Sequence, residues 1–202
     1  MCVALITGAS CIAQSPPKLP QSAAVIAEIK ETFTIGGKPI PPEIFRDFGD
    51  GNLADSKNIW VAVDAVAATK SNLYADHVSK QASWVVQKSA PDGDGAVEKT
   101  AYRYFGATNN GLLIAVASYS GGGSGDFFTL HVLHVVARHA FDFDGNVYER
   151  SELINLRRLP LGNRREGDVT ISGNAITIST SGRVDAGASN TSKRQVIEAY
   201  RP

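Results

Sequence analysis

The sequence predicts an α+β, mainly β fold: an antiparallel meander of about seven to nine strands with an amphipathic helix near the N-terminus. The sheet could be open, a sandwich or a partial barrel. Three observations support this prediction. Hydrophobic spacing changes from a helical period to a period of two near residue 58, and turn signals separate runs of strand-forming residues. A chain of 202 residues can also bury a sizeable core without disulfides or structural metals.

Residues 22–33 are expected to form the amphipathic helix. Ser22 can cap its N-terminus, and Gly36-Gly37 would end it. Four apolar residues share one face at helical spacing: Val25, Ile26, Ile29 and Phe33. A second, short helix is expected to start at Pro41-Pro42, because the fixed φ of proline suits the first helical turn.

The predicted strands lie between turn signals, and the one over 127–143 is long: 59–66, 83–88, 101–105, 112–119, 127–143, 146–156, 169–171, 175–179 and 195–200. Asn109-Asn110-Gly111 predicts a hairpin with a type I′ turn, which needs positive φ at two positions. Asp144-Gly145 and Ser172-Gly173-Asn174 predict two more tight turns. Strands joined by such short turns pair antiparallel, and the N-terminal helix is then available to cover one face of the sheet.

The charge balance bears on possible partners. Lys plus Arg and Asp plus Glu number 20 each, so the formal net charge is zero and no overall field favours nucleic acid. No apolar run approaches the roughly 18–20 residues that span a bilayer. We also expect no cofactor and no metal: on a strand, His131 and His134 point to opposite faces, and His139 lies too far along.

Residues 1–13 are apolar, end in small residues and offer Cys11-Ile12-Ala13 as a small-x-Ala cleavage site. We interpret them as a truncated signal peptide, followed by a linker over 14–20 and one globular domain over 21–202. The basic start of a signal peptide is missing, which a start codon placed too far downstream would explain. The expected location is therefore periplasmic or secreted.

Two alternatives remain for this N-terminal segment. Cys11 could carry a lipid anchor, although Gly8 stands where a lipobox has a large aliphatic residue. The segment could also be an ordinary buried strand. Cleavage after Ala13 would remove Cys2 and Cys11, the only cysteines, and thiol chemistry with them.

Two charged clusters are candidate sites. The acidic residues Asp47, Asp50 and Asp55 lie beside aromatic residues and could serve as a sugar-hydrolase pair or a cation site, or form a hydrogen-bonded capping loop. The basic cluster could meet an acidic partner or a phosphate: Arg157, Arg158, Arg164 and Arg165. Glu166 and Asp168 offset it, which favours a solvated connecting loop.

The leading functional hypothesis is an exported, non-enzymatic module that binds a protein or small-molecule ligand in the cell envelope. An exported hydrolase that uses the acidic residues between 47 and 55 is the alternative. A third hypothesis is a structural envelope component that assembles with itself through an edge strand.

Overall fold

The computed structural model describes residues 21–48, 61–71, 77–89, 95–164, 167–180 and 193–198. The signal peptide and linker expected over 1–20 lie outside these residues, as do Asp50, Asp55 and Arg165. Asp47 lies in a described helix, but its side chain is not described.

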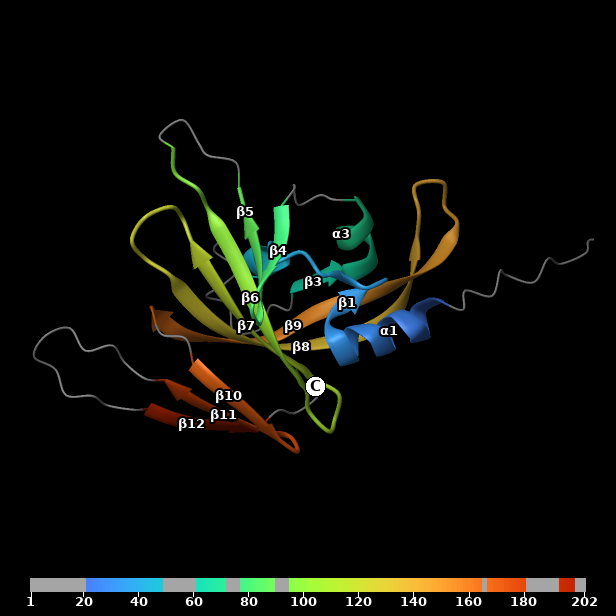
Figure 1. Cartoon of the computed structure of the whole chain (residues 1–202). Helices are drawn as coiled ribbons and strands as arrows, with labels where there is room; N and C mark the ends of the chain where they lie inside the picture. The colour runs from blue at the N-terminus through green and yellow to red at the C-terminus, as the bar shows by residue number, and fades with distance from the viewer. Residues whose placement is uncertain are drawn as a thin grey trace, which may run out of the picture.

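The main element is a seven-stranded antiparallel sheet in the order β3-β9-β8-β7-β6-β5-β4. Its strands are β3 (Val61–Asp64), β4 (His77–Gln81), β5 (Trp84–Lys88), β6 (Lys99–Ala107), β7 (Leu113–Ser120), β8 (Phe127–Phe141) and β9 (Val147–Asn163). From β4 to β9 each strand pairs with the next one in sequence, so the predicted meander is confirmed. The sheet curves around the helices as a half-barrel (Figure 1).

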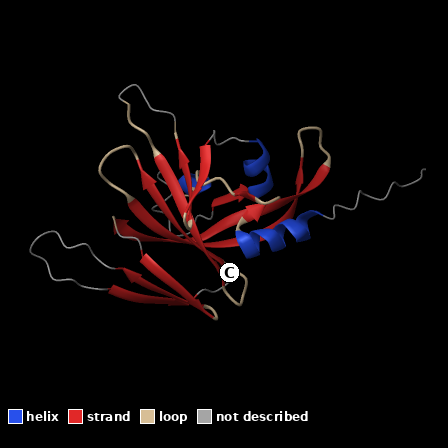
Figure 2. Cartoon of the chain, in the orientation of Figure 1, coloured by secondary structure: helices blue, strands red, loops and turns tan. Residues whose placement is uncertain are grey.

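Helices and a small sheet cover opposite faces of the large sheet (Figure 2). The face that we call the helix face carries α1 (Gln21–Thr32), α2 (Ile44–Asp47) and α3 (Ala65–Ser71), with the short ribbon β1 (Thr34–Ile35) and β2 (Lys38–Pro39). The other face packs against the small sheet: β10 (Gly167–Ser172), β11 (Ala175–Thr180) and β12 (Lys193–Glu198). The amphipathic helix predicted over 22–33 is thus present and packs on the sheet. Among the described residues, no helix is long and apolar enough to cross a membrane.

Strand β7 forms a wall of both hydrophobic cores. Its residues 113–118 are all buried, although a strand with one solvated face would alternate. Leu113 and Ala115 belong to the core under the helices, whereas Ile114 and Val116 belong to the core under the small sheet. The continuous apolar run Leu113–Ala117 therefore reflects cover on both faces.

Helix α1 ends earlier than its glycines suggest. Phe33 follows the last residue of the helix with a φ of 56°, and its N–H donates to the Ile29 carbonyl at 3.0 Å. Glycine usually fills such a position because a side chain strains it. Here the Phe33 ring is 1% exposed and stacks on Tyr104, with ring centroids 5.0 Å apart, so core packing holds the strained backbone.

Of the strand predicted over 59–66, the structure describes 61–66, and the last two residues are helical. β3 ends at Asp64, and α3 starts at Ala65. The Asp64 carboxylate accepts hydrogen bonds from the N–H groups of Val66 and Ala67, each at 3.0 Å, which is the geometry of a helix N-cap. Asp64 fits the alternation of a strand, so the sequence analysis did not identify it as the N-cap that marks the end of β3.

The β6–β7 hairpin is present, but its turn is not type I′. Gly111 has a φ of +77°, whereas Asn109 and Asn110 are absent from the positive-φ residues. The Gly111 N–H donates to the Thr108 carbonyl at 2.8 Å, which closes a turn with Gly111 after it in the left-handed region. This is a three-residue hairpin loop rather than a two-residue one.

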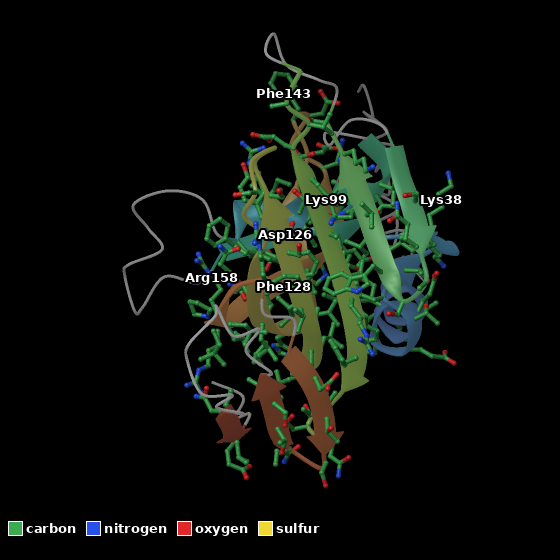
Figure 3. All side chains as sticks on the ribbon, turned by 60° about the vertical axis from the view of Figure 1, so that its left-hand side comes forward. Lys38, Lys99, Asp126, Phe128, Phe143 and Arg158 are labelled. Atoms are coloured by element: carbon green, nitrogen blue, oxygen red, sulfur yellow. The ribbon has the colours of Figure 1, made fainter. Side chains whose placement is uncertain are left out.

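The β8–β9 hairpin is the longest pair in the sheet, and it extends past its neighbours. β7 pairs with β8 only as far as Leu133, and β3 pairs with β9 only from Glu152 onwards. The rest is a two-stranded arm whose tip carries Phe143, far from the small sheet in Figure 3. Glu152, whose side chain is 6% exposed, forms ion pairs with Arg138 at 2.8 Å and with Arg150 at the base of this arm.

Candidate functional site

A cleft of about 340 Å³ opens on the helix face, between α2 and strands β6–β9. We call it the α2 cleft. It is lined by Phe45, Arg46, Thr100, Ala117, Ser118, Tyr119, Phe127, Thr129, His131 and Arg158. Its size lies at the lower end of the range of small-molecule sites, roughly 300–1,000 Å³.

His131 is the most deeply buried of the described polar residues that line the cleft, with 2% of its surface exposed. Its Nδ1 lies 3.2 Å from Asn155 Oδ1, and its ring meets Phe45 edge-on with centroids 5.0 Å apart. Burial lowers the pKa of His131 to about 3; the bond to Asn155 opposes this shift, and the charge of Arg158 adds to it. The imidazole is therefore neutral near pH 7.

One wall of the cleft is a network around Arg46. Arg46 Nη1 lies 2.7 Å from Glu98 Oε2, and the Tyr119 hydroxyl donates to the other oxygen of Glu98 at 3.3 Å. The guanidinium carbon also lies 5.9 Å from the centre of the Tyr119 ring, within cation–π range. These contacts fix the Arg46 head group beside the cleft.

Arg158 also lines the cleft. It stands across from His131 in the β8–β9 ladder, so both side chains lie on the helix face. Its Nη1 donates to the Phe48 carbonyl at 3.3 Å, at the residue that caps α2. This bond ties the short helix to the sheet and places a second guanidinium at the cleft.

A second cleft, of about 220 Å³, opens on the opposite face of the sheet. It is lined by Gln81, Trp84, Val86, Lys99, Ala101, Ser118 and Phe128. Figure 3 labels Lys99 and Phe128, which lie on the side that the small sheet partly covers. This cleft is smaller and has one charged residue among the described residues that line it, so it is the weaker candidate.

Among the predicted basic residues that the structure describes, Arg157 and Arg158 do not share a surface. Arg157 and Arg158 were expected in a solvated connecting loop, but both belong to β9. Arg157 pairs with Val132 and Arg158 with His131, so the two arginines face opposite sides of the sheet. Arg164 follows β9 and donates from Nε to the Ser124 carbonyl at 3.0 Å, across the β7–β8 connection.

Strand β9 continues through the arginines because β8 is long enough to pair with it as far as Asn163. The register shifts between Val132 and Leu133, and Leu156 is the extra residue of β9 at that point. A bulge of this kind interrupts the alternation of apolar and polar residues, so the period of two does not continue past Leu156. The predicted strand therefore ended at Leu156, before the arginines.

The acidic candidates are only partly placed. Asp47 is the last residue of α2, the helix that borders the cleft. Asp50 and Asp55 lie outside the described residues. The predicted separation of His131 and His134 onto opposite faces agrees with the register of β8. Within the described part of the chain, no group of three or more His, Cys, Asp or Glu residues could hold a metal ion.

Comparison with protein-family models, with curated proteins and with solved structures found no match for this chain. The α2 cleft is therefore interpreted from its own chemistry. It combines buried apolar surface from Phe45 and Ala117 with hydroxyl groups from Thr100 and Thr129. Two guanidiniums and a neutral imidazole complete it, and such a set can orient a small amphipathic molecule.

Proposed function

We propose that this chain is a non-enzymatic binding module that works outside the cytoplasm and holds a small molecule in the α2 cleft. The observation that supports this most is the convergence of polar groups on one partly apolar cleft. Small-molecule sites combine apolar lining with polar groups that orient the ligand, and both kinds of residue line this cleft. Residues 1–13, with the pattern of a signal peptide, support the extracytoplasmic part of the proposal.

The cleft is built from elements that lie far apart in the sequence, which favours a preformed site. The floor residue His131 comes from β8, the walls Arg46 and Arg158 from α2 and β9, and Thr100 from β6. His131, Thr100 and Phe45 are all buried, so the floor is packed before any ligand arrives. A preformed site loses little conformational entropy when it binds.

A fragment screen followed by ¹H–¹⁵N correlation spectra on the full chain tests this proposal. We expect shifts at the amides of Arg46, Thr129 and Arg158. Thr129→Trp should fill the cleft and abolish them. Thr170→Trp, on an exposed position of β10, is the matched control and should leave them unchanged. Shifts that gather only around Lys99 and Phe128, or no shifts at all, would reject the α2 cleft as the site.

A further inference from the structure

We infer that the ligand of the α2 cleft is a compact organic carboxylate with an aromatic or short aliphatic body. This inference rests on the proposed function and names the class of molecule. It starts from the charges around the cleft. Among the described lining residues, Arg46 and Arg158 are cationic and none is acidic. Glu98 does not line the cleft but forms an ion pair with Arg46 beside it.

Both guanidiniums border the cleft, and each has a structural partner. Arg46 is held by Glu98 and Tyr119 on the α2 side, and Arg158 is held by the Phe48 carbonyl on the β9 side. A guanidinium has five N–H donors in a planar fork, so it can keep a structural partner and still bind a carboxylate. Charge-assisted bonds of this kind are about twice as strong as neutral ones.

The hydroxyl groups of the cleft can serve an anionic ligand. The His131 imidazole is buried and uncharged, so the positive charge at the cleft comes from the arginines. Thr100 and Thr129 line the same space and can donate hydroxyl hydrogen bonds to a carboxylate. A cationic ligand would find donors and positive charge here, and the described lining residues offer it no carboxylate.

The apolar residues of the cleft indicate what kind of group the carboxylate of the ligand is attached to. Phe45 is 4% exposed and closes the inner side, whereas Phe127 is 56% exposed and stands at the rim. An aromatic or short aliphatic body would lie between these two rings, with offset or edge-on contacts for an aromatic one. A volume of about 340 Å³ limits the ligand to a small molecule.

The test compares three probes of one shape and different charge: phenylacetate, 2-phenylacetamide and 2-phenylethylammonium. Each is titrated into the full chain at neutral pH and followed by calorimetry and by the amide shifts of the cleft. We expect phenylacetate to bind at least about tenfold more tightly than the other two. Equal binding of the amide or the ammonium would overturn the carboxylate inference and leave the cleft standing as a site.

Variants test whether the arginines contribute to ligand binding beyond any effect on folding. Arg158→Gln should weaken phenylacetate binding about tenfold or more, and Arg158→Lys should restore part of it. Arg157→Gln is the matched control, since Arg157 is exposed and on the opposite face of the same strand. If Arg158→Gln unfolds the chain, as circular dichroism would show, Arg46→Gln carries the same comparison.

The remaining outcomes are also decisive. If fragments bind in the cleft but phenylacetate does not, or if its affinity is unchanged in both Arg46→Gln and Arg158→Gln, the ligand class is wrong while the proposed function stands. If neither the fragments nor any of the three probes bind there, the proposed function itself fails.

Discussion

His131 and Arg158 stand directly opposite each other in the β8–β9 ladder, and both line the α2 cleft. A histidine next to a fixed positive charge resists protonation, and burial is the larger cause of the low pKa of His131. The hydrogen bond to Asn155 partly offsets both effects. The pair thus keeps a neutral imidazole beside a permanent cation.

This relationship predicts an acid-sensitive fold. The pKa of His131 falls from its usual 6.5 to about 3 in the folded chain, so the unfolded chain binds a proton at higher pH. The stability contributed by neutral His131 is complete above pH 6.5 and is lost as the pH falls toward 3. The loss should approach about 1.4 kcal/mol per pH unit.

Urea unfolding at several pH values between 7 and 5 measures this loss above the range where carboxyl groups titrate. In His131→Gln the slope in this window should shrink by about the same amount. A slope that is equal in wild type and variant would show that His131 is already charged in the folded chain or exposed to water.

Glu28 fixes the turn that follows α1. Its carboxylate accepts hydrogen bonds from the Thr34 hydroxyl at 2.7 Å and from the N–H groups of Gly36 and Gly37 at 2.9 and 2.8 Å. These bonds, with Gly37 contributing most, lower the pKa of Glu28. Glu28→Gln should lower the melting temperature, and the difference should vanish in acid, where the wild-type carboxyl is protonated. Glu31→Gln, on an exposed position of the same helix, is the control and should melt like wild type.

The ion pairs of Glu152 should stabilise the β8–β9 arm. It is 6% exposed and pairs with Arg138 and Arg150, which are 60% and 39% exposed. Glu152→Gln should cost about 1–3 kcal/mol of unfolding free energy, because charged hydrogen bonds are lost at a buried position. Glu149→Gln lies on the same strand and should have little effect. Equal stability of the two variants in denaturant titration would mean that the ion pairs contribute nothing.

The hydrolase alternative has its own test. If carboxylates among Asp47, Asp50 and Asp55 act as general acid and base, replacing one by Asn should lower turnover about 10²–10⁴-fold. Release of nitrophenol from nitrophenyl glycosides and esters measures this. For a non-enzymatic module we expect wild type and all three Asn variants to show the same background rate. Turnover well above background that disappears in any variant would support the hydrolase instead.

Export predicts a defined mature protein. The intact mass from the native host should correspond to a chain that begins at Gln14, found outside the cytoplasm. A full-length chain in the cytoplasm would overturn the predicted location. A mass increased by lipid at Cys11 would indicate an anchored lipoprotein instead.

The sheet was largely predictable because its strands alternate or are continuously apolar and its turns are short. The run around Ile114 and the Asn110-Gly111 step together located the β6–β7 hairpin. β4 was missed because His77–Gln81 is mostly polar and exposed, and only its pairing with β5 makes it a strand. Pairing of this kind is a tertiary effect that a local pattern does not contain.

The α2 cleft was not predictable from the sequence for a related reason. Its residues come from five elements, and no spacing along the chain connects Arg46 with Thr100 or Arg158. His131 stands in a strongly apolar stretch, which could have marked it as buried. Arg158 pairs with His131 in the β8–β9 ladder, but the bulge at Leu156 interrupts the alternation of inward and outward residues in β9. The pattern before the bulge therefore did not predict which face Arg158 occupies.

Because β7 is buried on both faces, the chain cannot be truncated to its large sheet without exposing one core. Leu113 and Ile114 are neighbours in sequence and lie in different cores, so the large sheet is covered on both faces at β7. A fragment that stops at Asn163 would keep all seven strands yet present a bare apolar wall where Ile176, Ile178 and Ile197 had packed. Such a wall drives self-association. Strands β10–β12 therefore shield this apolar surface from water. A chain truncated after the large sheet should aggregate rather than fold into a smaller functional protein.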